Sequence, residues 1–168
     1  LPGKVGLACS FDGKSFVDAG DVGKFNYLGA FSLGAWILPR NPNGTILSRI
    51  EDFSQGAGYS LSLKEGKVRL HITLRWSDIG MRLETAAPIA MDQWQHVLMT
   101  YDGKRKASGV RIYINGQSQP IVVLFDELTY PLNNAEPFRI GAGEGPQNRF
   151  QGLIDEVRVY RKALSAEE

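Results

Sequence analysis

Alternation of apolar and polar residues with a period of two is the feature that most constrains this fold. Every second residue is apolar over 31–37, and the same pattern runs over 67–76, where one side is Val68, Leu70, Ile72, Leu74 and Trp76. Successive side chains of a strand point to opposite faces of a sheet, so the pattern predicts half-buried strands. Further strands are predicted over 59–63, 94–101, 110–115, 120–124, 138–141 and 153–160.

Turn residues separate these segments and indicate antiparallel neighbours. Asn115-Gly116 is the strongest short hairpin signal in the chain, and Glu65-Gly66 predicts a second turn. No long helical period competes with the strands. The chain is therefore predicted to form one all-β domain over residues 1–168, a sandwich of two antiparallel sheets. The polar stretch 127–137 is expected to be one long surface loop.

Composition and charge exclude several classes of protein. The 168 residues carry 19 Lys and Arg against 18 Asp and Glu, which gives a net charge of +1. A nucleic-acid partner is not expected, because such binders show a basic excess. No apolar run approaches the roughly 20 residues of a membrane span. The single cysteine, Cys9, permits no internal disulfide.

The two ends indicate a segment of a longer polypeptide. The chain has no initiator Met, and Leu1-Pro2-Gly3-Lys4 does not begin a signal peptide. Ser165 precedes Glu168 by three residues, which is the spacing of a helix capping box. We therefore expect the domain to have neighbouring domains of a parent protein among its partners.

Three stretches carry a family resemblance. They are FSLGAWILP at 31–39, WQHVLMTYDG at 94–103 with GVRIYING at 109–116, and FQGLIDEVRVY at 150–160 with ALS at 163–165. Together they resemble the laminin-G-like, concanavalin A-like lectin/glucanase superfamily, and the resemblance implies a jelly-roll sandwich. That superfamily contains lectins, glycosidases and adhesion modules, so the fold alone does not give the function.

A closer resemblance concerns the protein's context. Segments 11–21, 46–49 and 58–59 are similar to laminin-G-like modules of large exported bacterial proteins that also carry cytochrome-c-like domains. This resemblance implies an exported, periplasmic or cell-surface location.

No catalytic motif is present. Retaining enzymes of the superfamily carry an E-x-D-x-x-E strand motif, which this chain lacks. The adjacent pairs Glu51-Asp52 and Asp155-Glu156 would point to opposite sides of a strand. We therefore expect a non-enzymatic module, although a glycosidase with carboxylates from two separate strands stays open as an alternative.

The resemblance also implies a concave sheet face, where lectin-like relatives bind sugars. The residues expected to line such a groove here are Trp36, His71, His96, Arg111 and Tyr113. An exposed indole offers a stacking platform, and the polar members offer directional hydrogen bonds. In the alternative interpretation Trp36 is buried or a neighbouring domain covers the groove, and the module only docks against other domains. Trp76 and Trp94 are expected to be packing residues.

Calcium is the candidate cofactor, and the other expectation is no cofactor at all. Relatives hold one Ca²⁺ near the rim, and the two ends of the chain run close together in them, so Asp12 and Asp155 are the predicted ligands. Each also has a simpler interpretation, as an acceptor for backbone amides in a turn.

Overall fold

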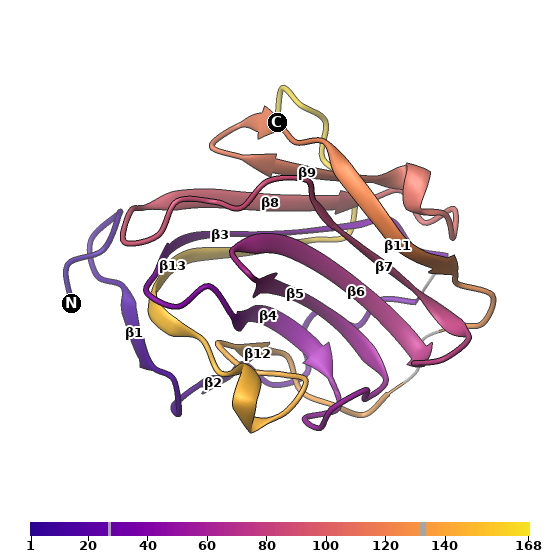
Figure 1. The fold of residues 1–168 in the computed structure, drawn as a ribbon, viewed down its shortest axis with the longest axis horizontal. Coiled ribbons are helices and arrows are strands. Elements are labelled where there is room, and N and C mark those ends of the chain that lie inside the picture. Colours follow the sequence, from indigo (N-terminus) through magenta and orange to yellow (C-terminus); the bar gives the residue numbers. More distant parts are fainter. Residues whose placement is uncertain (27, 132–133) are drawn as a thin grey trace.

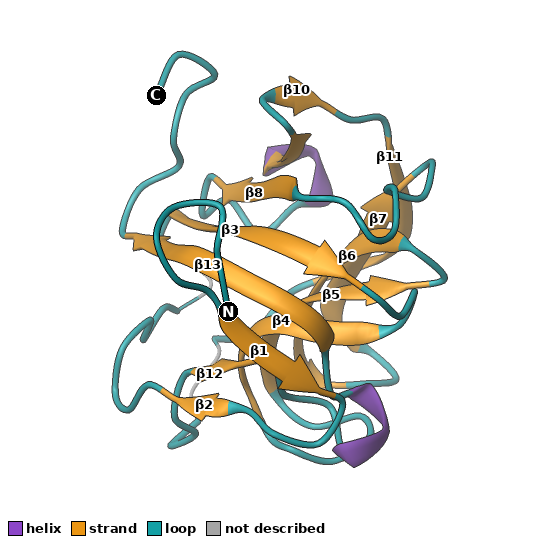
Figure 2. Cartoon of the chain, turned by 90° about the vertical axis from the view of Figure 1, so that its left-hand side faces the viewer, coloured by secondary structure: helices purple, strands orange, loops and turns teal. Residues whose placement is uncertain are grey.

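The computed structural model describes all of residues 1–168 except 27, 132 and 133, and the described residues form two packed antiparallel sheets (Figures 1 and 2). The six-stranded sheet has the order β1 (Cys9–Asp12), β13 (Gln151–Tyr160), β3 (Phe31–Pro39), β8 (Gln95–Tyr101), β9 (Val110–Ile114) and β10 (Gln117–Ser118). The seven-stranded sheet has the order β11 (Ile121–Glu127), β7 (Ile79–Thr85), β6 (Lys67–Arg75), β5 (Gly58–Lys64), β4 (Gly44–Ile50), β12 (Arg139–Ile140) and β2 (Val17–Asp18). The predicted all-β sandwich is confirmed.

The core lies between the sheets, where the alternating apolar residues meet. Phe31 and Ile37 of β3 and Leu70 and Ile72 of β6 are fully buried in one core cluster, as the period of two requires. At one end of the core Phe31 also packs against Tyr59 and Tyr101, with ring centroids 5.4 and 5.5 Å away. The outer faces of the two sheets remain as the surfaces on which a site can be built.

Both predicted hairpin turns are present. Asn115 and Gly116 have φ of 51° and 79°, and Glu65 and Gly66 have φ of 53° and 77°. Two successive positive φ values match the twist of the flanking strands, which is why Asn-Gly marks such turns. The expected loop over 127–137 begins at the last residue of β11, and residues 132 and 133 within it lie outside the described part of the chain.

The two ends of the chain lie on the outer face of the six-stranded sheet (Figure 2). At the N-terminus, the backbone N–H of Val5 donates to Asp155 Oδ2 at 2.9 Å. At the C-terminus, the Ser32 hydroxyl donates to the carbonyl of Lys162 at 2.8 Å and accepts the N–H of Leu164 at 3.0 Å. The ends therefore cover part of this face.

The described helices are two short 3-10 turns, η1 (Ala107–Gly109) and η2 (Pro146–Asn148). None of the helices described is long and apolar enough to cross a membrane.

Candidate functional site

A row of mostly polar side chains crosses the outer face of the seven-stranded sheet. Strand register pairs the residues one after another from β4 to β11, and the row is Ser48, Ser60, His71, Arg82 and Phe125. Paired residues of adjacent strands project from the same side of a sheet, so these side chains are neighbours. The core-facing residues of the same strands, such as Leu61 and Leu83, are fully buried between the sheets.

Trp76 lies over this row, although alternation predicts that it shares the core face with Val68. The register between β6 and β7 shifts between Thr73 and Arg75, and the strand ends at Arg75. A shift of one residue moves all following side chains to the opposite face. The indole consequently meets His71 edge-on, with ring centroids 4.8 Å apart.

The guanidinium of Arg82 lies over two aromatic rings. The carbon of its guanidinium lies 4.0 Å from the centre of the Trp76 ring and 5.5 Å from that of Phe125. Burial, together with the charge of Arg69, lowers the pKa of Arg82 from its usual value. All three side chains of this group are partly buried, which leaves part of each accessible to a ligand.

A glycine-rich loop places a carboxylate beside the row. Gly143, Glu144 and Gly145 have φ of 136°, 61° and 101°, a region that favours glycine and is strained for glutamate. The Ser48 hydroxyl donates to the carbonyl of Ala142 at 2.6 Å, which pins the loop to β4. Strain of this kind persists only where the surroundings fix it, and it concentrates at functional sites.

Glu144 Oε1 joins the loop to the two central strands. It accepts the Ser60 hydroxyl at 2.6 Å and lies 2.8 Å from His71 Nδ1. Burial opposes the charge of Glu144, but these two hydrogen bonds and the charges of His71 and Arg69 outweigh it and lower the pKa of Glu144. Ser60 and His71 are 0% and 4% exposed, so the network is held inside the structure before any ligand arrives.

Both oxygens of a second carboxylate on this face, Glu84, are engaged by cations. Glu84 Oε1 accepts from Lys67 Nζ at 3.1 Å, and Glu84 Oε2 accepts two hydrogen bonds from Arg69 at 2.7 and 3.1 Å. These hydrogen bonds and charges exceed the opposing effect of burial, so the pKa of Glu84 is lowered. Glu84 thus pairs with both Lys67 and Arg69 and neutralises one of their two positive charges.

The residues predicted to form one groove are divided between the two sheets. Trp36 and His96 pair across β3 and β8 on the outer face of the six-stranded sheet, with ring centroids 5.2 Å apart. Lys4 of the N-terminal segment lies over the Trp36 ring at 4.6 Å. A cleft of about 210 Å³ beside these rings is also lined by Leu164 and Glu168 of the C-terminal segment.

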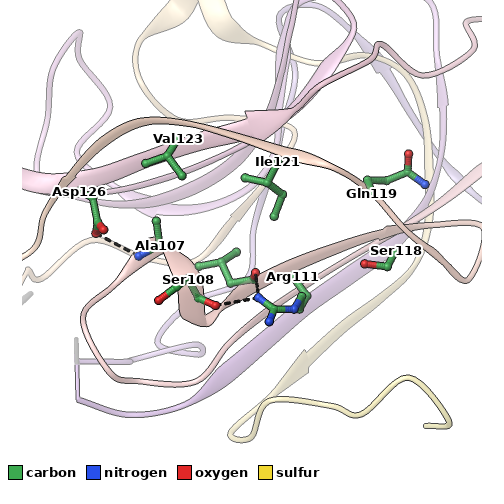
Figure 3. Close-up of a pocket in the computed structure, with 9 residues that line it drawn as sticks. Ala107, Ser108, Arg111, Ser118, Gln119, Ile121, Val123 and Asp126 are labelled. Carbon is green, nitrogen blue, oxygen red and sulfur yellow. Dashed lines mark hydrogen bonds between the residues drawn. The ribbon is translucent and has the colours of Figure 1, made fainter.

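The other predicted groove residues lie elsewhere. Tyr113 lines an adjoining cleft of about 250 Å³ with His96. Arg111 borders a separate cleft of about 480 Å³ at the edge of the sandwich, where its guanidinium donates to the carbonyls of Ser108 and Val110 (Figure 3). His71 lies on the opposite sheet. The structure therefore does not bring the five residues into one groove, because alternation identifies the outer side of each strand but not the sheet to which it belongs.

The predicted calcium ligands are also apart. Asp12 pairs with Gln151, and Asp155 lies four residues further along β13, roughly 13 Å at about 3.3 Å per residue. Calcium ligands lie about 2.3–2.6 Å from the ion, so these two carboxylates do not share one. Asp12 Oδ1 instead accepts the N–H groups of Lys14 and Ser15, and Asp155 accepts those of Val5 and Glu156. Among the described residues, no three His, Cys, Asp or Glu side chains cluster to hold a metal.

Two side chains of the site, Arg82 and Glu144, are not among those that the sequence predicts. Arg82 lies in β7, where Met81 and Leu83 alternate with Arg82 and Glu84, a pattern that is typical of a strand. Glu144 stands in Gly141-Ala-Gly-Glu-Gly-Pro, whose glycine content indicates an unusual backbone. Neither pattern reveals that the two side chains lie on the same face of the sandwich.

Comparison with known proteins agrees with the fold. Residues 11–168 match a laminin G profile described as the concanavalin A-like lectin/glucanases superfamily. Among curated proteins, the adhesion G-protein coupled receptor V1 of Danio rerio is 26% identical over 147 residues, 82% of this chain. The match spans about 2% of that receptor's length.

Solved structures of similar fold include two carbohydrate-binding proteins. Domain 4 of the extracellular arabinanase AbnA from Geobacillus stearothermophilus, in complex with arabinotriose, has a TM-score of 0.67 and 23% identity over 99% of this chain and 76% of that one. The CBM40 of the Ruminococcus gnavus IT-sialidase, bound to alpha2,3 sialyllactose, has a TM-score of 0.72 and 16% identity over 96% and 91%. Domains LG4-5 of the mouse laminin alpha1 chain have a TM-score of 0.70 and 18% identity over 99% and 45%.

Proposed function

Because this chain belongs to the concanavalin A-like lectin/glucanases superfamily, we propose that it is a non-catalytic module that binds carbohydrate. The ligand site is the outer face of the seven-stranded sheet around Trp76, Arg82 and Glu144. Two of the similar structures are described with an oligosaccharide bound, which supports this class of ligand.

The observation that carries the proposal is the stack of Trp76 on Arg82 over a sheet row. An indole presents an apolar surface to the C–H groups of a sugar ring, and its polar neighbours fix the orientation of the hydroxyl groups. Arg82 supplies N–H donors at the edge of the stack. The site thus combines one apolar platform with a few directional polar groups, as small-ligand sites do.

Glu144 supplies the acceptor. Its Oε1 is engaged by Ser60 and His71, whereas Oε2 has no hydrogen-bond partner among the described residues. A sugar hydroxyl can donate to Oε2 without disturbing the network that fixes the loop. Since the loop is already positioned, binding costs little ordering entropy.

The same residues support a role without catalysis. Hydrolysis of a glycosidic bond normally needs two carboxyl groups with separate tasks. Of the two carboxylates next to Arg82 on this face, Glu84 is held by Lys67 and Arg69. Glu144 remains as the single carboxylate available to a ligand among them.

The proposal extends to where the protein acts. The arabinanase of similar fold is described as extracellular. We place this module in an exported protein, where it would hold its neighbouring domains at a polysaccharide. We also propose that the parent protein resembles the large exported bacterial proteins that carry cytochrome-c-like domains.

A glycan array followed by titration calorimetry tests the function. Wild type should bind at least one glycan, and Trp76→Ala should weaken that binding by tenfold or more, since truncating a buried binding-site Trp costs about 2 kcal/mol. Trp36→Ala is the matched control, because it removes the same side chain from the other sheet and should retain affinity within about twofold. Absence of binding to every glycan, or loss only in Trp36→Ala, contradicts the proposal.

A further inference from the structure

We propose that the site selects saccharides that carry a carboxylate group and that Arg82 is the residue that binds this group. The inference rests on the proposed function and names the class of sugar. Its basis is the difference between Arg82 and the other cations on the same sheet face.

The neighbouring cations are already paired. Arg69 donates two hydrogen bonds to Glu84, and Lys67 donates a third. A carboxylate that accepts two hydrogen bonds from one arginine in this way offsets most of that arginine's attraction for a second anion.

Arg82 has no such partner. Within the described part of the chain, its guanidinium makes no hydrogen bond and lies within ion-pair distance of no carboxylate. Its contacts are with the rings of Trp76 and Phe125. Ring faces attract the charge of a guanidinium but do not accept its in-plane N–H donors. The N–H donors of Arg82 therefore remain available to a ligand.

The two rings also fix the orientation of these donors. A guanidinium is planar, and its N–H groups form a fork that matches the two oxygens of a carboxylate. With ring centroids 4.0 and 5.5 Å from its guanidinium carbon, Arg82 loses little further freedom when an anion binds. This preorganisation favours a planar, two-oxygen group over a single hydroxyl.

The charges around Arg82 favour an anion as well. Lys67 and Arg69 are the cations that share this part of the sheet with Arg82, and Glu84 pairs with both of them. Arg69 and burial both disfavour the charge of Arg82, as the lowered pKa of Arg82 indicates, whereas Glu144 acts in the opposite direction. A bound carboxylate would offset the unfavourable effects of burial and of Arg69 on the charge of Arg82. Glu144 would accept hydrogen bonds from the hydroxyl groups of the same sugar. The carboxylate group of the sugar would then be bound by Arg82 and not by Glu144.

Matched pairs of saccharides test this inference. Oligogalacturonate and sialyllactose are each compared by calorimetry with their carboxyl-reduced forms, in which only the acid is converted to an alcohol. The wild-type 168-residue chain should bind one of the acidic forms at least tenfold more tightly than its reduced partner. Arg82→Gln should bind both members of that pair with similar affinity, and Arg82→Lys should keep only part of the preference.

Arg111→Gln is the matched control, because it removes an exposed arginine from the other sheet and should leave the preference unchanged. Equal affinity of wild type for both members of each pair, with loss in Trp76→Ala, overturns the acid preference and leaves the proposed function intact. Binding of no saccharide overturns both. A sulfated galactan bound as tightly as the carboxylated ligands shows general anion binding and contradicts selection of carboxylates.

Discussion

The two outer faces of the sandwich carry the same three kinds of side chain, a tryptophan, a histidine and a cation. On the six-stranded sheet, Trp36 lies 5.2 Å from His96 and beneath Lys4 at 4.6 Å. On the seven-stranded sheet, Trp76 lies 4.8 Å from His71 and beneath Arg82 at 4.0 Å. Composition alone therefore does not distinguish the two faces.

What separates them is the part of the chain that lies on each. The two chain ends cover the Trp36 face, and Lys4 comes from one of these ends. On the Trp76 face Arg82 comes from the sheet itself, and the covering element is one strained loop that presents Glu144. A face is available for a ligand when its polar groups belong to the rigid scaffold and not to segments laid over it.

The largest effect is expected where the strained loop meets β4. A Cβ added at Gly143, where φ is 136°, would lie 2.4 Å from Ser48 Oγ. We expect Gly143→Ala to lower the free energy of unfolding by about 2–4 kcal/mol and to abolish glycan binding, because Glu144 is displaced.

Gly116→Ala is the control for this change. Gly116 also has a positive φ, 79°, in the hairpin of the other sheet, but its added Cβ meets nothing within 4 Å. Gly116→Ala should lower the free energy of unfolding, measured in urea, by only about 1 kcal/mol. If the two substitutions destabilise equally, the loop on β4 is not fixed by its contacts and the contrast between the faces fails.

A smaller effect distinguishes two buried serines. The Ser32 hydroxyl binds the C-terminal segment, whereas the Ser60 hydroxyl donates to Glu144. Each Ser→Ala change should cost about 1 kcal/mol of stability, the usual net value of a hydrogen bond. Hydrogen exchange should then speed up at residues 162–165 only in Ser32→Ala, and glycan affinity should fall only in Ser60→Ala. A loss of glycan affinity only in Ser32→Ala would mean that the functional face is the one bearing Trp36.

The fold could be predicted from the sequence because it depends on local patterns. The apolar sets of 31–37 and 67–72 face the core as alternation requires, and Asn115-Gly116 forms its turn. Strand β4 lacks this signal, since all seven of its residues are buried: Thr45 and Ser48 donate to carbonyls of the 142–143 loop, and Arg49 donates to the carbonyl of Val22. Where both sides of a strand are covered, a period of two carries no information.

The site was less predictable because it depends on register and sheet membership. Trp76 leaves the core face through a shift of register after Thr73, which no residue in the sequence marks. The sequence predicts that His71 faces outward in one groove with Trp36, but Trp36 lies on the opposite sheet. Strand order arises from contacts distant in sequence, so alternation gives the side of each residue and leaves its neighbours undetermined.

The smallest effect is expected in the pH dependence of the free energy of unfolding. The titratable groups of the two faces should change it over different pH ranges. Burial lowers the pKa of His96 from its usual 6.5. As the pH falls, His96 of the unfolded chain takes up a proton before His96 of the folded chain does. The contribution of His96 to the free energy of unfolding is therefore complete above about pH 6.5 and is lost as the pH falls below that value. The pKa of Glu144 is lowered from its usual 4.5, so its contribution is lost only on acidification below about pH 4.5.

Urea unfolding between pH 8 and pH 3 separates the two contributions. His96→Gln should flatten the decline between pH 7 and pH 5 and leave the acid limb unchanged. Glu144→Gln should be less stable than wild type at pH 7, and the difference should shrink below about pH 4.5, since the wild-type carboxylate is then protonated as well. Other carboxylates with lowered pKa values, such as Asp52 and Glu84, contribute equally to both chains and cancel in the comparison. A constant difference at every pH would show that Glu144 stabilises its loop without its charge, and the electrostatic half of the contrast between the two faces would then be wrong.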